Sequence, residues 1–144
     1  MARKLVTKLS NRECFTLTEK DTLKTASNKL QTHNVGVMPV LSEHDKSVIG
    51  IISERDLARY IYRDEFSSEL LVTKIMTTNI ISCNLNTSVT ELMEIISSHK
   101  IRHIPIIEEN KLLGIVSIGD VVNHIIEQYK DENQFFYHHI ENNI

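Results

Sequence analysis

Hydrophobic and polar positions along the chain follow the same order twice, once in each half. Runs of β-forming residues flank a stretch with apolar residues at helical spacing, and each half ends in a second helical pattern. In the first half we expect strands at 14–17, 35–41 and 47–52 and helices at 23–33 and 56–62. In the second half we expect strands at 80–83, 101–107 and 112–116 and helices at 89–99 and from 121 onward. The pattern predicts a mixed α/β chain of two similar units.

Two sequence blocks indicate that the halves arose by duplication. Residues Gly50–Asp56 read G-I-I-S-E-R-D, and Gly114–Asp120 repeat the pattern as G-I-V-S-I-G-D. The two prolines of the chain, Pro39 and Pro105, stand ahead of these blocks in matching apolar tracts. The offset is 66 residues for the prolines and 64 for the glycines, because the turn between the two strands is shorter in the second half. Ordered blocks at nearly constant spacing are typical of a tandem repeat.

Composition and charge narrow the class of protein. Of the 144 residues, 41% are hydrophobic and 24% are charged, which is ordinary for a globular domain. A half of about 65 residues buries only roughly 60% of its unfolded surface, so we expect the halves to share one core as a fused domain. A net charge of -3 gives no positive field for nucleic acid or an anionic membrane. We therefore expect neither as a partner.

The cysteines and the N-terminal residues indicate the cellular compartment of the protein. Cys14 and Cys83 each belong to an apolar tract, which favours buried thiols over a disulfide framework or a redox site. No run of eighteen apolar residues occurs, and residues 1–18 lack the continuous hydrophobic stretch of a signal peptide. Basic residues near the N-terminus leave an organellar transit peptide as an alternative. Cytoplasmic location is the expectation.

The C-terminal residues 129–144 carry an unusual share of large side chains. They hold four of the eight aromatic residues, Tyr129, Phe135, Phe136 and Tyr137, within an otherwise polar stretch. This is a large apolar surface for a free chain end. We expect this tail to cover another surface, either of its own chain or of a partner.

Each half resembles a CBS domain, the motif named after cystathionine β-synthase, and the whole chain is similar to a stand-alone CBS pair. The resemblance covers residues 5–128 and rests on the strands Val37–Val40 and His103–Ile106 and on the two glycine-led blocks. It implies an α+β fold in which two β-α-β-β-α units pack through their sheets with pseudo-twofold symmetry. The predicted segments are 5–65 for unit 1, 72–128 for unit 2 and 129–144 for the tail. The family further implies a homodimer and clefts that take adenosine nucleotides.

The glycine-led blocks offer groups that suit a nucleotide. A strand that turns directly into a helix leaves backbone amides free at the helix start, where an anion is favoured. Ser53 and Ser117 add a hydroxyl at this point, and Asp56 and Asp120 follow one helical turn later, where a carboxylate can accept from a ribose diol. The alternative is a structural cap, because Ser followed three residues later by an acid also fits a capping box.

Further candidates come from the strands. Val37, Met38 and Ile104 would give apolar faces to an adenine ring, or else serve as plain core; proline beside them places these strands at a sheet edge or beside a cleft. By the resemblance, the hydroxyl residues Thr16 and Ser82 face the clefts. The remaining candidates are the cationic or titratable side chains Arg55, Arg102 and His103, of which the arginines suit phosphate. The alternative is a salt bridge to a nearby acid for Arg55 and a solvated surface position for Arg102 and His103. Because the first half has no counterpart of Arg102 and His103, the two clefts should differ in affinity.

The sequence holds no phosphate-binding glycine loop, no HExxH motif and no histidine set with zinc spacing, so we expect no catalysis, no metal and no required cofactor. Two functions remain. One is a regulatory sensor in which AMP, ADP or ATP binds between the units and changes their affinity for a regulated partner protein. The other is a structural scaffold that dimerises while its clefts stay empty.

Overall fold

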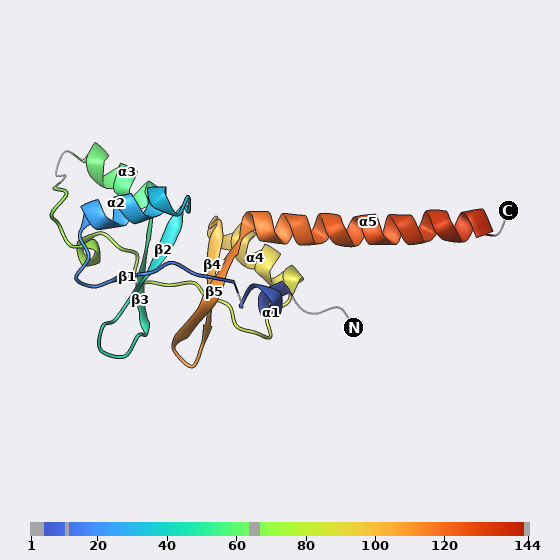
Figure 1. Ribbon diagram of the computed structural model, residues 1–144, viewed down its shortest axis with the longest axis horizontal. Helices are drawn as coiled ribbons and strands as arrows, with labels where there is room; N and C mark the ends of the chain where they lie inside the picture. Colours follow the sequence, from blue (N-terminus) through green and yellow to red (C-terminus); the bar gives the residue numbers. More distant parts are fainter. Residues whose placement is uncertain (1–4, 11, 64–66, 143–144) are drawn as a thin grey trace.

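The computed structural model describes residues 5–10, 12–63 and 67–142 and has two α/β units side by side, with a long helix leading away from the second (Figure 1). The first unit contains β1 (Leu17–Thr18), α2 (Leu23–Thr32), β2 (Val37–Leu41), β3 (Val48–Ser53) and α3 (Glu54–Tyr62). The second contains η1 (Val72–Lys74), α4 (Val89–His99), β4 (His103–Glu108), β5 (Lys111–Ser117) and α5 (Ile118–Asn142), and a short helix α1 (Leu5–Leu9) precedes both. The predicted α+β class is confirmed; the proposed end of unit 1 at residue 65 lies outside the described residues.

Polar caps set the start of the helices that cover the sheets. Thr22 Oγ1 accepts a hydrogen bond from the amide of Thr25 at 3.2 Å, and Ser88 Oγ accepts from the amide of Glu91 at 3.1 Å. These bonds satisfy amides that have no partner within the first turn of a helix. Asp21, the other candidate for the first cap, instead accepts from the amide of Thr18 at 2.8 Å and closes the turn after β1.

Each unit is built on an antiparallel hairpin. In the first, β2 pairs with β3 and β1 adds in parallel, so that β2 is the middle strand. Of the two positions predicted for Pro39, a sheet edge or a place beside a cleft, the edge is excluded. Proline is tolerated in this middle strand because β1 pairs with β2 from Val40 onward, beyond the missing amide. In the second, β4 and β5 are joined by Glu109 and Asn110, both with positive φ, as a two-residue hairpin turn requires.

The first strand predicted for the second unit, 80–83, is wrong as a regular strand. Cys83 alone makes a parallel bridge to Ile106, with its amide donating to Pro105 O and its carbonyl accepting from the amide of Ile107, both at 2.9 Å. Pairing stops because Asn84 turns the chain at once: its side-chain oxygen accepts from the amide of Asn86 at 2.8 Å. The first unit has Thr18 at the equivalent position and keeps a longer pairing.

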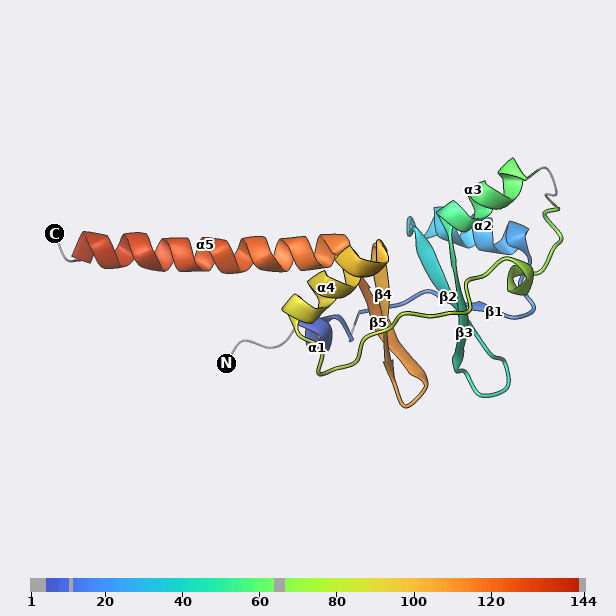
Figure 2. The ribbon, with the colours of Figure 1, turned by 180° about the vertical axis from the view of Figure 1, so that it is seen from behind.

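Two separate hydrophobic cores form among the described residues, so the prediction of one shared core is wrong. The core of the second unit includes Leu5 and Val6 from α1, and the core of the first includes Val72 from η1. Val6 and Val72 are equivalent repeat positions, and each is completely buried. Each unit therefore receives the N-terminal segment of the other, and this exchange compensates for the small size of each half. The chain crosses between the units at residues 12–16 and again after η1 (Figure 2).

The repeated glycines, Gly50 and Gly114, lie where the exchanged segments cross the hairpins. A methyl group at position 114 would lie 2.9 Å from the carbonyl oxygen of Leu9, the last residue of α1. A methyl group at position 50 would collide with the side chain of Met76, from the segment after η1. Both glycines lie inside regular strands, so the repeated glycine serves here to let a segment from the other unit's sequence approach the hairpin closely.

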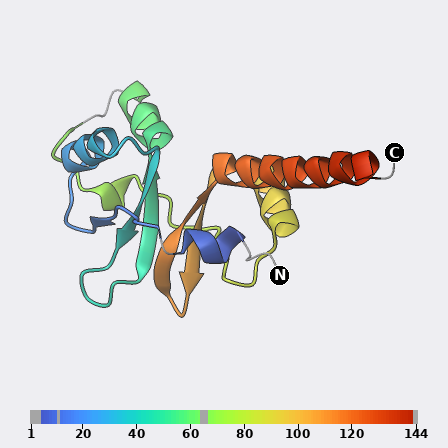
Figure 3. The ribbon, with the colours of Figure 1, turned by 45° about the vertical axis from the view of Figure 1, so that its right-hand side comes forward.

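Helix α5 begins on the second unit and then leaves it. Val121 and His124 in its first turns are buried, whereas its later part runs away from both units in each view (Figures 1 and 3). Of the two surfaces predicted for the tail, its own chain or a partner, the direction of this helix does not support the first. Tyr129 is 66% exposed, and the side chains of Phe135, Phe136 and Tyr137 lie outside the described part of the structure.

Candidate functional site

A cavity of about 410 Å³ lies between the two units. Its wall comes from the segment that crosses between them, from the loop between α2 and β2, and from strands of both hairpins. The lining residues are Arg12, Glu13, Cys14, Phe15, Asn34, Val35, Gly36, Val37, His103, Ile115 and Ser117. The wall combines apolar surface at Phe15, Val35 and Val37 with polar groups at Arg12, His103 and Ser117. This size and this mixture are typical of a small-molecule site.

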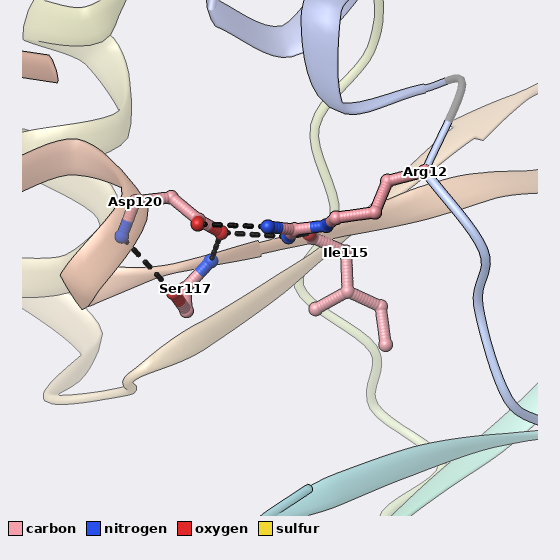
Figure 4. A network of polar contacts seen from close by, with 4 residues as sticks. All are labelled: Arg12, Ile115, Ser117 and Asp120. Carbon is pink, nitrogen blue, oxygen red and sulfur yellow. Dashed lines mark hydrogen bonds and ion pairs between the residues drawn. The ribbon is translucent and has the colours of Figure 1, made fainter. Parts of the chain in front are cut away.

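The polar end of the cavity is organised by Arg12, which reaches across to the second unit (Figure 4). Its Nη1 and Nη2 donate to Asp120 Oδ1 and Oδ2 at 2.9 and 2.8 Å, and Nη2 also donates to Ile115 O at 2.8 Å. The same carboxylate accepts from the amide of Ser117 at 2.8 Å, and Ser117 Oγ accepts from the amide of Asp120 at 3.0 Å. Arg12 therefore stands at the cavity wall, with Asp120 held behind it.

The charges of this pair are fixed by their contacts. The hydrogen bond to Asp120 raises the pKa of Arg12, against the opposing effect of its burial. Burial of the Asp120 carboxylate acts to raise its pKa, but hydrogen bonds from Arg12 and Ser117 outweigh burial and hold the pKa below its ordinary value. Both groups are charged at neutral pH, and the bidentate geometry favours arginine over lysine here.

We expect the Arg12–Asp120 pair to stabilise the fold by only about 0.5–1 kcal/mol at pH 7, because the Arg12 side chain is 51% exposed. The measurement is a double-mutant cycle of Arg12→Ala and Asp120→Asn by urea unfolding. Because the pKa of Asp120 is depressed in the folded state, the coupling is present above the ordinary aspartate pKa of about 3.9 and is lost as the pH falls through the lower folded value.

The control for this cycle is the exposed pair Lys20–Glu43, at 2.9 Å, whose side chains are 78% and 39% exposed. Its coupling energy should lie close to zero, because an exposed pair gains little in water. A coupling between Arg12 and Asp120 no larger than that of the control would contradict the expectation.

The two glycine-led blocks have the same local geometry. Asp56 Oδ2 accepts from the amide of Ser53 at 2.9 Å, and Ser53 Oγ accepts from the amide of Asp56 at 3.1 Å, which is a complete capping box at the start of α3. The capping interpretation therefore describes both blocks. The blocks differ in the charged residue available to them. Arg12 binds Asp120 of the second block, whereas the repeat counterpart of Arg12, 66 residues later, is the uncharged Thr78.

The other predicted residues divide by strand alternation. Val37 and His103 line the cavity, whereas the side chains of their neighbours Met38 and Ile104 are completely buried in the two cores. Successive side chains of a strand point to opposite faces, so the side chains of Met38 and Ile104 follow the plain-core alternative and give no apolar face to the cavity. Among the remaining candidates Thr16 is half-buried, and Arg55, Ser82 and Arg102 are exposed.

His103 faces Gly36 across the cavity, with its Cε1 3.6 Å from where a methyl group at position 36 would lie. Burial lowers the pKa of His103, and Arg102 adds to this, while Asp120 and Glu54 act in the opposite direction. The imidazole is therefore neutral at pH 7 and can serve as a hydrogen-bond donor or acceptor without charge.

Sequence reasoning missed Arg12, Phe15 and Asn34 as members of this site. Phe15 stacks on His33 with ring centroids 3.6 Å apart, which places its ring beside the end of α2. A repeat alignment could have flagged Arg12, because its counterpart Thr78 is uncharged. Cys14 also lines the cavity, but burial raises its pKa, and burial raises the pKa of Cys83 to about 11. Neither thiol is activated for redox chemistry.

Comparison with known proteins defines the family. The CBS domain model matches residues 6–63 and 72–127, and the chain belongs to this family as a CBS-domain pair. It is 35% identical over 121 residues to the CBS domain-containing protein CBSX3, mitochondrial, of Arabidopsis thaliana, covering 81% of this chain and 59% of that protein. The crystal structure of the CBS-domain containing protein ATU1752 from Agrobacterium tumefaciens is similar at a TM-score of 0.74 and 33% identity, over 83% of this chain and 94% of that one.

One further neighbour carries ligands. The CBS domain pair of protein MJ0100 was solved in complex with 5-methylthioadenosine and S-adenosyl-L-methionine, and it matches with a TM-score of 0.77 over 88% of this chain and 99% of that one. At 22% identity this likeness supports the fold alone. Within the described part of this chain, no helix combines the length and the apolar character needed to cross a membrane.

Proposed function

We propose that this CBS pair is a regulatory module, without catalysis of its own, that binds an adenosine nucleotide between its units. The observation that carries the proposal is the cavity of about 410 Å³ with an apolar wall and an arginine at its polar end. An adenine ring suits the surface of Val35 and Val37, and phosphate suits the guanidinium of Arg12. The adenosine ligands of the related MJ0100 pair support the same ligand class.

Two sets of residues form the proposed clefts. The first set contains Arg12, Val37, His103 and Ser117, which line the cavity, and Asp120, which binds Arg12. We add Thr16 and Arg102 to this set because each is next in sequence to a lining residue. The second set comprises Ser53, Asp56 and Ser82, which are the repeat counterparts of Ser117, Asp120 and Thr16, together with Arg55. Because the first set alone contains the Arg12–Asp120 pair and His103, we propose that it binds the nucleotide more tightly.

Arg12 gives the first cleft a specific property. Three of the four acceptor sites of the Asp120 carboxylate are taken by Arg12 and by the amide of Ser117, so a ribose diol can donate to both oxygens only if Arg12 releases them. We propose that a nucleotide phosphate draws Arg12 away from Asp120, so that one ligand satisfies both side chains. Such a change alters the tie between the units and thereby the affinity for a regulated partner.

Calorimetric titration of adenosine, AMP, ADP and ATP into the full chain tests this function. Asp120→Ala should weaken nucleotide binding about tenfold to a hundredfold, because it removes hydrogen bonds to a charged group, while Asp56→Ala should have a smaller effect. Arg12→Ala should strengthen adenosine binding, by freeing Asp120, and weaken ATP binding. Circular dichroism of each variant controls for folding.

Absence of any binding to the folded wild-type chain would overturn the nucleotide proposal. The second candidate would then be preferred, namely a scaffold that assembles through its surface. A specific observation favours that candidate, because Ile61, Tyr62, Val122, Ile126 and Tyr129 are all exposed large apolar side chains on α3 and α5. Homodimerisation and cytoplasmic location belong to both candidate functions and are proposed with them.

A further inference from the structure

The C-terminal part of α5 lies beyond the family match. The match ends at residue 127, whereas the helix continues to Asn142. Residues 128–142 extend the helix by roughly 20 Å at 1.5 Å per residue, and the ribbon there leads away from both units (Figure 3). A helical segment of this length is marginal in water unless one face packs against something. The extension therefore requires a partner surface.

The described part of α5 has two distinct faces. Val121 and His124 are 3% and 9% exposed and pack on the second unit. A second set is apolar but exposed: Ile118 42%, Val122 46%, Ile125 37%, Ile126 45% and Tyr129 66%. At 3.6 residues per turn this set falls within roughly 100° of the helix circumference, away from the buried face. We call it the α5 stripe.

The α5 stripe continues in sequence at coiled-coil spacing. Val122, Ile126, Tyr129, Asn133, Phe136 and Ile140 follow one another in alternating steps of four and three residues. This is the spacing of the a and d positions of a heptad repeat, with Asn133 at an a position. A single asparagine at an a position is a device that fixes register between two identical helices. The positions between, such as Glu127 and Asp131, are charged.

We propose that the α5 stripe is the seam of a parallel two-stranded coiled coil with α5 of a second copy of this chain. A second copy fits because the heptad pattern is self-complementary: each apolar layer meets its own equivalent, and Asn133 meets the partner's Asn133. The parallel orientation follows from Ile118 and from Met93 on the neighbouring helix α4, which are 42% and 47% exposed where α5 joins its unit. A parallel pair brings these two bases together, whereas an antiparallel pair leaves them uncovered.

This inference deepens the proposed homodimer by naming its surface, and it is independent of the nucleotide cleft. Sedimentation of the full chain measures the dimer dissociation constant. The double variant Ile126→Glu and Tyr129→Glu should raise it about tenfold or more, because charges enter the seam of both copies. The matched control, Gln128→Glu with Gln134→Glu, adds the same charge off the seam and should leave it unchanged.

Oxidative cross-linking tests the orientation. In a parallel pair, Asn133→Cys brings two thiols to one layer of the seam, within the range of a disulfide, and should give a covalent dimer on a non-reducing gel. Gln134→Cys, one position off the seam, should not.

Each other outcome overturns a defined part of the inference. A dimer whose dissociation constant is unchanged by the stripe variant would leave the homodimer intact and exclude this surface. A monomeric wild-type chain would overturn both and assign the stripe to a different partner. A stripe-dependent dimer without the Asn133→Cys cross-link would contradict the parallel orientation.

Discussion

Gly114→Ala is expected to destabilise the protein by about 3 kcal/mol, because the added methyl group has no space to occupy. Its carbon would lie 2.9 Å from the carbonyl oxygen of Leu9 and 3.6 Å from Ile106 Cδ1. The first neighbour is backbone, so relief requires the exchanged N-terminal segment to move as a whole. That movement would pull Leu5 and Val6 away from the core of the second unit. Urea unfolding at pH 7 measures the loss.

Two other glycines provide controls for Gly114→Ala. Gly50→Ala should cost about 1 kcal/mol, since its methyl group meets the side chain of Met76, which can adopt another rotamer. Gly119→Ala meets only Ser117 Oγ at 3.6 Å, in the first turn of α5, and should be neutral or stabilising by a few tenths of a kcal/mol. Equal losses at positions 50 and 114 would show that backbone crowding by Leu9 is not the cause.

Val6→Ala and Val72→Ala should each cost about 2–3 kcal/mol, but each in the opposite half of the molecule from its place in the sequence. Both side chains are completely buried, and each belongs to the core of the other unit. Truncation leaves a cavity in that core alone, because the two cores are separate. Unfolding in urea gives the overall loss for each variant.

Hydrogen exchange with mass spectrometry locates the loss. Val6→Ala should raise exchange in α4, β4 and β5, and Val72→Ala should raise it in α2, β2 and β3, because local opening follows the weakened core. The two variants are controls for each other, since they make the same change at equivalent repeat positions. Faster hydrogen exchange in α2, β2 and β3 for Val6→Ala, or in α4, β4 and β5 for Val72→Ala, would contradict this assignment of the valines to the cores.

Local features of this protein could be predicted from sequence, because they depend on nearby residues. Strand and helix order follows from hydrophobic spacing, and the Ser–Asp blocks follow from a repeat that two prolines and two glycines mark. The sequence also allows the prediction that Val37 faces the cavity and Met38 faces the core, since strand alternation puts them on opposite faces. It was missed because both were assigned to one ligand.

Features that depend on long-range crossing could not be predicted in the same way. The ion pair of Arg12 with Asp120 joins residues 108 positions apart, and nothing in the sequence around Arg12 specifies it. The single shared core was predicted from the size of each half alone, because a half of about 65 residues buries little surface by itself. In the structure each half completes its own core with a segment from the other half, α1 in the second unit and η1 in the first, so no shared core is needed.

Residues 12–15 have a mechanical consequence that follows from their position. On one side they are anchored through α1 in the core of the second unit, and on the other side through Leu17 in the core of the first unit. The same residues form part of the cavity wall. Because both ends of this segment are held in hydrophobic cores, any displacement of residues 12–15 would strain both cores at once. A short stretch of irregular backbone thus couples the two halves of the molecule mechanically.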